Sequence, residues 1–249
     1  MRFIDRTGEI NYNTFGSEMK IVRYRNDRDI DVLFPKYNWV FKNARYGNFK
    51  NKGIKCPYEP RVCGKGFIGE GFYTPKDNKK IYIKWQSMLE RCYDEKFQKK
   101  NPTYEGCKVC EEWLNFQNFA KWYEENYYEI KGEQIHLDKD ILIKGNKTYS
   151  PENCIFAPIK INSLFTKREE CRGKYPIGVK PNGKGYSSRC RNAYGKEVSL
   201  GNFNTPHEAF LIYKLNKELV IQSVAQKYKK LIPNRLYEAL INYKVEEDD

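Results

Sequence analysis

The sequence predicts an α+β protein that is built from three consecutive parts. Short runs with a two-residue hydrophobic period occupy both ends of the chain, and such runs indicate antiparallel sheets. In the middle, aromatic residues recur at helical spacing before a strand–loop–strand–helix segment. We therefore expect a small antiparallel β module over residues 1–73, a helical part with that segment over 74–170, and a three-stranded sheet with a helix over 171–249.

The composition favours a folded, basic protein. Of 249 residues, 45 are Lys or Arg against 32 Asp or Glu, which gives a formal charge of +13, and 40% are hydrophobic. A folded surface this basic attracts polyanions, and interleaved aromatic rings can stack on bases. We therefore favour double-stranded DNA as the partner over a merely solvated basic surface.

The chain carries no signal of membrane insertion. It contains no uninterrupted apolar run of about 18 residues and no apolar stretch near Met1 that is typical of a signal peptide. We expect a cytoplasmic protein without a membrane partner, and the host cytoplasm if a phage encodes it. In that compartment the eight cysteines stay reduced.

Two strands are predicted in the first part, over residues 19–25 and 29–34, with a turn between them. Further short runs at 38–42 and 45–49 carry aromatics between basic residues and would complete a small sheet or partly open barrel. With its glycine-rich end GKGFIGEG, this part resembles an accessory repeat found in front of phage HNH proteins. Contact with the DNA backbone and a purely structural role stay equally open for four basic residues: Lys20, Arg23, Arg25 and Lys50.

Two helices are predicted in the middle, because large apolar side chains recur every three to four residues. The first has Tyr82, Trp85, Met88, Leu89 and Cys92 on one face. The second has Trp113, Phe116, Phe119, Ala120 and Tyr123. Both stripes are expected to form core rather than to stack on bases.

The stretch from Ile135 to Phe165 reads as a strand, a loop, a second strand and the start of a helix. Asp138 ends the first strand, and His136 lies two residues earlier, on the same face of that strand. Asn153 precedes the second strand, and Asn162 lies in the helix. Carboxylate, amide and imidazole groups thus converge on one short element.

The motifs W-x2-M-x2-RC, Y-x2-C-x2-C-x2-W, LDKD and YSPENC follow one another over about 80 residues from Trp85 onward. In this order and spacing they resemble a phage and mobile-element group of HNH endonucleases, whose core is the ββα-metal fold. The resemblance implies that Asp138 and Asn162 hold Mg²⁺ or Mn²⁺ and that Asn153 ties the loop to the second strand.

One position departs from that family, because Lys139 stands where the family has its histidine base. Neutralising a lysine at pH 7 costs about 4 to 5 kcal/mol, so Lys139 is a poor base and is better suited to contact phosphate. His136 or a metal-bound hydroxide would replace the missing base, although His136 can equally be a plain surface or half-buried imidazole. Asp140 is a further metal ligand or a surface acid, and it shares the face of Asp138 if the strand continues.

The cysteines allow a zinc site as an alternative to core thiols. Cys107 and Cys110 form one CxxC, and they could join Cys154 and Cys171 around zinc, as in zinc-bearing HNH relatives. No second CxxC follows at zinc-finger spacing. We favour core thiols at Cys110 and Cys154 and do not expect a structural zinc ion.

Residues 175–203 contain three strand-like runs that are separated by turns at 181–185 and 192–195. The first turn carries Asn-Gly, a strong hairpin signal. A helix follows, in which Thr205 is the cap, Pro206 the first residue and Glu208 the partner in a capping box. Its apolar face is predicted to carry Ala209, Ile212, Tyr213, Leu219 and Val220.

His207 then falls in the first turn of this helix, at the surface, and a last short helix is expected after Pro233. The frame of Gly178-Val179, Leu200-Gly201, Phe203 and Glu208-Ala209 resembles the APETALA/ethylene-response-factor domain, which lays a three-stranded sheet in the DNA major groove. By that resemblance six residues would face DNA: Lys180, Lys184, Tyr186, Arg189, Arg191 and Lys196. Arginine is the usual reader of guanine and phosphate, and Arg189 and Arg191, two apart, share one sheet face.

These observations predict a DNA-binding HNH-type endonuclease that hydrolyses phosphodiesters with a divalent metal. Two alternatives stay open. One is a catalytically degenerate HNH scaffold that binds DNA as a regulator or as a blocker of another DNA-acting machine. The other is an inhibitor of a host protein, which the order of the motifs disfavours.

Overall fold

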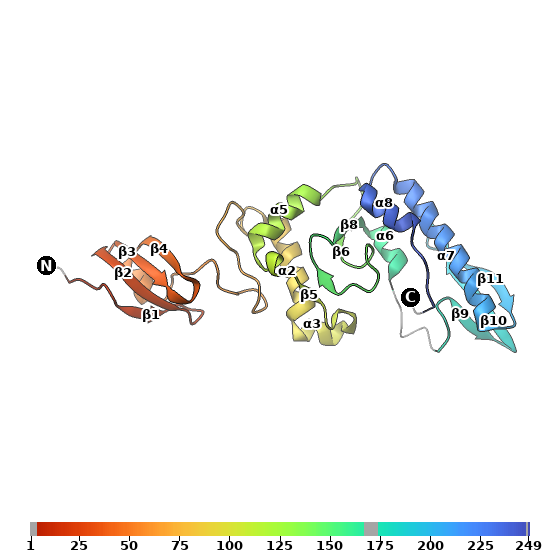
Figure 1. Cartoon of the computed structure of the whole chain (residues 1–249), viewed down its shortest axis with the longest axis horizontal. Coiled ribbons are helices and arrows are strands. Elements are labelled where there is room, and N and C mark those ends of the chain that lie inside the picture. The colour runs from red at the N-terminus through yellow and green to blue at the C-terminus, as the bar shows by residue number, and fades with distance from the viewer. Residues whose placement is uncertain (1–3, 167–173, 248) are drawn as a thin grey trace. The chain divides into compact units, whose positions relative to one another are not determined.

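The computed structural model describes residues 4–166, 174–247 and 249 (Figure 1). Its fold is mixed α+β, as predicted, with a four-stranded antiparallel sheet near the N-terminus and a three-stranded antiparallel sheet with a helix near the C-terminus. The chain divides into two compact units, Met1–Glu125 with Lys147–Ser150, and Asn126–Asn146 with Pro151–Asp249. The boundary predicted near residue 171 lies outside the described residues.

None of the helices within the described residues combines the length and the apolar character that a membrane span needs.

The N-terminal sheet has the strand order β1-β2-β3-β4. The strands are β1 Ile10–Tyr12, β2 Glu18–Asn26, β3 Asp29–Phe34 and β4 Trp39–Ala44, with the short helix η1 Pro35–Tyr37 before β4. The two strands predicted first are therefore confirmed. Alternate residues of β2 and β3 are fully buried and form the core of this sheet: Met19, Ile21, Ile30, Val32 and Phe34.

The run at 45–49, expected to complete the sheet, is instead the helix α1 Tyr46–Lys50. Phe49 is fully buried in the core of the sheet, and the ring of Tyr46 stacks on it at 6.1 Å between centroids. Residues three apart reach one side only if the chain turns as a helix. The burial of two aromatics on the same side therefore overrides the strand expectation.

The helical part of the first unit begins with α2 Lys79–Tyr93, which buries Trp85, Met88, Leu89 and Cys92 as predicted. The predicted second helix is divided into α4 Glu111–Leu114 and α5 Phe116–Asn126, because Asn115 is extended and its side chain caps the new helix through the Gln117 amide. Four short elements complete this part: α3 Glu95–Lys100, η2 Pro102–Tyr104, β5 Lys108–Val109 and β7 Thr148–Tyr149. β5 and β7 pair in parallel.

The second unit contains the predicted strand–loop–strand–helix order. β6 Ile135–Asp138 pairs antiparallel with β8 Ile155–Pro158, and α6 Ile159–Asn162 begins directly after β8, followed by η3 Ser163–Phe165. Every residue of β8 is buried. The strand therefore runs through the interior and fixes both β6 and α6.

The C-terminal sheet has the order β11-β10-β9, from β9 Val179–Asn182, β10 Gly185–Arg191 and β11 Glu197–Phe203. The long helix α7 Pro206–Tyr228 packs on it, and α8 Asn234–Ile241 packs on α7. The three strands, the capping box of Thr205 with Glu208 and the last short helix are confirmed.

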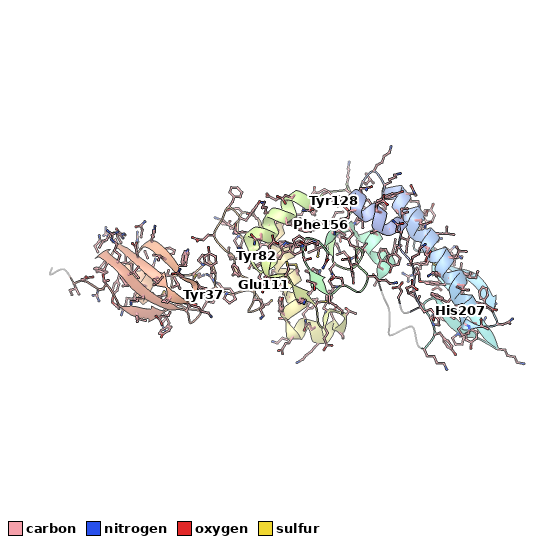
Figure 2. The ribbon with its side chains drawn as sticks, viewed as in Figure 1. Tyr37, Tyr82, Glu111, Tyr128, Phe156 and His207 are labelled. Atoms are coloured by element: carbon pink, nitrogen blue, oxygen red, sulfur yellow. The ribbon has the colours of Figure 1, made fainter. Side chains whose placement is uncertain are left out.

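The predicted apolar face of α7 is wrong at Leu219, whose side chain is 54% exposed. The buried residues are Ala209, Phe210, Tyr213, Ile221, Val224 and Ala225. The first half of α7 packs on the strands and another part packs on α8. Because the partner changes along the helix, a single stripe does not describe its buried residues. His207 lies at the surface in the first turn, as predicted, with 69% of its side chain exposed (Figure 2).

Candidate active site and nucleic-acid interface

The candidate active site is built on β6. Along this strand, the buried Ile135 and Leu137 alternate with the partly buried His136 and Asp138. Residues two apart on a strand share a face, so the imidazole and the carboxyl group lie on the same side of the β6–β8 pair. This is the arrangement that the spacing of the two residues predicted.

Asp138 ends the strand through its own side chain. Its Oδ1 accepts hydrogen bonds from the backbone N–H groups of Asp140, at 2.9 Å, and of Ile141, at 2.7 Å. An aspartate that binds the backbone two residues on turns the chain. The strand therefore stops, and Asp140 does not continue the face of Asp138 along β6, as it would in a longer strand.

The two carboxyl groups nevertheless interact. Burial, and then the negative charge of Asp140, raise the pKa of Asp138 to about 6, while the two backbone N–H groups act in the opposite direction. Burial and a nearby like charge both disfavour the ionised form. The ionised form of Asp138 is therefore disfavoured.

Lys139 is buried, with 8% of its surface exposed. Its Nζ lies 3.0 Å from Oδ2 of Asp140, whose side chain is 47% exposed. The ion pair thus holds the ammonium group of Lys139 at the carboxylate of Asp140, in the residue that directly follows β6.

Two asparagines tie the loop to the strands. Asn146 donates from Nδ2 to the carbonyl of Lys139 at 2.6 Å, and Asn153 donates from Nδ2 to Oδ1 of Asn146 at 3.2 Å. Asn153 precedes β8 by two residues, and Lys139 follows β6 directly. The chain of bonds therefore holds the end of one strand to the approach of the other.

Asn162 is the last residue of α6, a helix that packs on β6 and β8. Its side chain is partly buried and forms no hydrogen bond with the rest of the described chain. Oxygen ligands from carboxylates and amides suit Mg²⁺, and a divalent cation would relieve the repulsion between Asp138 and Asp140. The residues fit such an ion, although the described residues contain no cluster of three or more His, Cys, Asp and Glu side chains.

Three of the four cysteines of the zinc alternative lie within the described residues. Cys107 and Cys154 are buried, and Cys110 is partly buried. Cys171 lies outside the described residues. The burial of Cys154 agrees with a core thiol.

The candidate nucleic-acid interface is the C-terminal sheet. Along β10, Ser188 and Cys190 are buried in the core that includes α7, while Arg189 and Arg191 are exposed. Lys180 lies opposite Ser187 in β9 and is exposed as well. Arg189 pairs with Glu197 at 3.3 Å, whereas Arg191 lines a pocket together with Lys217 of α7.

Tyr186 is an even number of residues from Ser188 and Cys190 along β10, so it shares their face of the strand. It packs with the buried residues under α7, and its ring lies 5.3 Å from that of Tyr175, edge to face. Lys184 and Lys196 are exposed in the turns beside β10. The structure thus separates Tyr186 from the basic residues with which the resemblance groups it.

In the N-terminal sheet, two of the four basic candidates are already paired. Arg25 forms ion pairs with Asp29, at 2.9 Å, and with Asp31, at 2.8 Å, and Lys50 lies 3.3 Å from Glu9. Lys20 and Arg23 are exposed and form no ion pair within residues 4–166.

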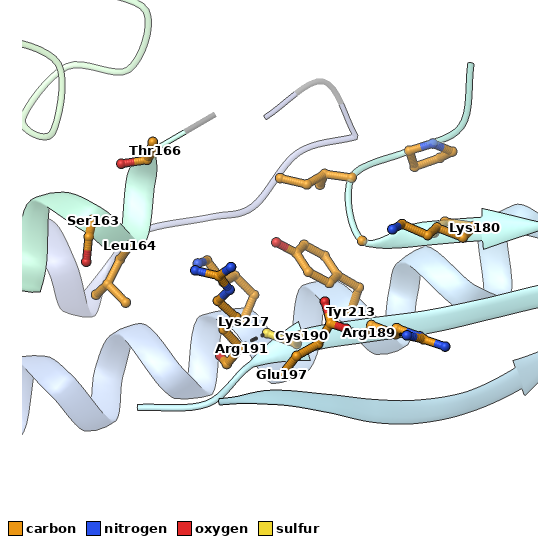
Figure 3. Close-up of a pocket in the computed structure, with 14 residues that line it drawn as sticks. Ser163, Leu164, Thr166, Lys180, Arg189, Cys190, Arg191, Glu197, Tyr213 and Lys217 are labelled. Carbon is orange, nitrogen blue, oxygen red and sulfur yellow. Dashed lines mark hydrogen bonds and ion pairs between the residues drawn. The ribbon is translucent and has the colours of Figure 1, made fainter. Parts of the chain in front are cut away.

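The sequence reasoning did not single out Lys217, which lines a pocket of about 450 Å³ in the second unit (Figure 3). It stands four residues after the buried Tyr213 on α7, so both lie on one helical face. The sequence signal that could have identified Lys217 is its position four residues after an aromatic residue that was predicted to be buried.

Comparisons of the chain with models of protein families, with curated proteins and with solved structures find no match.

Proposed function

We propose that this chain is a DNA-binding endonuclease of the HNH type, from a phage or mobile element, that hydrolyses phosphodiesters with Mg²⁺ or Mn²⁺. The observation that carries the proposal is the β6–β8–α6 element, in which the carboxyl group of Asp138 interacts with that of Asp140. Asp138 and Asn162 would hold the ion, with Asp140 as a further ligand. When bound, such an ion supplies Lewis-acid stabilisation of the scissile phosphate.

Proton transfer, charge stabilisation and DNA binding are assigned to separate residues of the chain. His136, on the same strand face as Asp138, takes the proton of the attacking water as the general base. Lys139, held by Asp140, places positive charge beside the phosphate. Lys180, Arg189 and Arg191 bind the DNA backbone and base edges from the C-terminal sheet.

A second candidate has a specific observation in its favour. Lys139, which is buried and paired with Asp140, occupies the position where the family carries its base. A scaffold with that substitution can bind DNA without cutting it, and the protein would then act as a regulator or a blocker. Nothing in the described residues favours the third candidate, an inhibitor of a host protein.

The test is incubation of the protein with supercoiled plasmid and Mg²⁺ or Mn²⁺, followed by measurement of nicked and linear DNA. Asp138→Ala and Asn162→Ala are expected to abolish cleavage, and His136→Ala to lower its rate about 100-fold, the usual contribution of a general base. Asn234→Ala removes an exposed amide at the start of α8 and serves as the matched control, with unchanged cleavage.

Cleavage that survives in Asp138→Ala, Asn162→Ala and His136→Ala alike would contradict the proposed site. If the wild-type protein binds DNA tightly in a salt-sensitive manner but never cuts it, the second candidate replaces the first, because salt sensitivity reports phosphate contacts. Binding that is insensitive to salt would contradict both.

A further inference from the structure

The pocket in the second unit lies where the turn after α6 meets the C-terminal sheet (Figure 3). Its volume is about 450 Å³, within the range of about 300 to 1,000 Å³ that is usual for small-molecule sites. The hydroxyl-bearing residues Ser163 and Thr166 line it from the turn. Lys180, Arg191 and Lys217 line it from β9, β10 and α7.

Lys217 is a partly buried cation on α7. It forms no hydrogen bond or ion pair within the described residues, and burial lowers its pKa from the ordinary value, as does the neighbouring charge of Arg191. The carboxylate of Asp249 acts in the opposite direction, but it already accepts from Lys144 at 2.6 Å and from the backbone of Glu246 at 2.8 Å. Two like charges are thus held side by side at the pocket.

The other charges of the lining do not compensate this excess. Arg191 and Lys180 are exposed and form no ion pair within the part of the chain that the structure describes. The only carboxylate among the residues that line the pocket, Glu197, is paired with Arg189 at 3.3 Å. Four cations therefore face one carboxylate, which leaves a strongly positive pocket.

At one wall of the pocket, the backbone of Gly178 lies close to the ring of Tyr213. Gly178 has φ +78°, and a Cβ at this position would lie 2.0 Å from Cδ2 of Tyr213. Only glycine lets the chain before β9 lie flat on that ring. Gly178 and Tyr213 therefore form one wall of the pocket that Arg191 and Lys217 also line.

We infer that this pocket binds the phosphate group of a nucleotide, with Lys217 and Arg191 as its principal ligands. A phosphate suits the charge excess, and its oxygens match the donors of arginine and lysine. The inference rests on the proposed function for nucleic acid as the natural source of the phosphate, whereas a free nucleotide offers the same group. The site is separate from the carboxyl groups of β6.

The experiment titrates the full chain with a 5′-deoxynucleoside monophosphate by calorimetry, and with a fluorescent DNA duplex by anisotropy at several salt concentrations. Lys217→Gln and Arg191→Gln are each expected to weaken binding about tenfold and to lower the salt slope with the duplex by about one. Lys230→Gln also removes one positive charge from the second unit, but Lys230 is exposed and does not line the pocket. This control is expected to change affinity less than twofold.

Nucleotide binding that depends on Lys217 identifies a free nucleotide or a strand end as the source, and dependence with the duplex alone identifies the DNA backbone. Equal effects of Lys217→Gln and Lys230→Gln on both probes would overturn the inference. If Lys217→Gln does not fold, Arg191→Gln provides the comparison in the nucleotide titration, which does not involve the duplex contact proposed for Arg191. Because neither titration requires cleavage, its outcome is independent of the plasmid assay.

Discussion

Two aspartates on strands, Asp31 in the N-terminal sheet and Asp138 at the end of β6, have opposite electrostatic surroundings. Asp31 is 8% exposed and accepts two hydrogen bonds from Arg25, at 2.8 and 3.1 Å, and one from the Asn43 amide. The bonds from Arg25, more than any other contribution, lower the pKa of Asp31. Burial, and then the charge of Asp140, raise the pKa of Asp138 to about 6.

The difference distinguishes a structural carboxylate from one that is available for chemistry. Asp31 has its counter-ion within its own sheet, so its charge is compensated when the chain folds. The carboxyl group of Asp138 interacts with a second carboxyl group, that of Asp140, with which Lys139 forms an ion pair. An uncompensated carboxyl group in a partly buried position is typical of a functional site. The same distinction separates Arg25, which is paired, from Arg191, which forms no ion pair with any residue that the structure describes.

The largest expected effect is the stabilisation of the fold by Asp138→Asn. Because the folded pKa of about 6 exceeds the ordinary 3.8, the wild-type protein loses stability as pH rises from 3.8 through 6. At pH 7.5 the loss is on the order of 2 to 3 kcal/mol. Asparagine keeps an oxygen for the backbone amides of Asp140 and Ile141, so the variant regains that stability at pH 7.5 but not at pH 4.

The measurement is the free energy of unfolding in denaturant at both pH values, with a chelator present so that no divalent cation binds. The comparison between Asp31 and Asp138 fails if the Asp138→Asn variant is less stable than the wild type at pH 7.5.

Arg25→Met tests the other aspartate and is expected to give a smaller effect of opposite sign. The pKa of Asp31 is lowered, so its pairing stabilises the fold above pH 3.8, and that contribution is lost as pH falls through the folded value. The variant should melt about 3 to 6 °C below the wild type at pH 7. The gap should close in acid. Thermal melting across pH measures this, and a gap that persists at the lowest pH would mean that Arg25 acts through packing.

Much of the fold is encoded locally, which is why it could be predicted. The alternation over β3 and the capping residues Thr205 and Glu208 depend only on neighbours in the chain. The order of β6, β8 and α6 follows from short runs of apolar residues and from the turn signals between them. Asp138 and His136 could be placed on one face because a strand has a fixed period of two.

The remaining features depend on contacts between distant residues. The pairing of Arg25 with Asp31 requires the register of β2 against β3, and the parallel pairing of Val109 with Tyr149 joins segments 40 residues apart. Lys217 meets Arg191 only because α7 packs on β10. Neither spacing nor composition reports such contacts, so the charge balance of each site had to come from the structure.

The smallest expected effect is the stabilisation of the wild-type fold by Mn²⁺. A divalent cation between Asp138 and Asp140 would neutralise their negative charge, as Arg25 neutralises the charge of Asp31. At a concentration ten times the dissociation constant, a ligand that binds only the folded state adds about 1.4 kcal/mol. Melting at pH 7.5 with and without Mn²⁺ should show this gain in the wild type and in Arg25→Met, but not in Asp138→Asn. Equal stabilisation of all three proteins would place the cation elsewhere and contradict a metal site at Asp138 and Asp140.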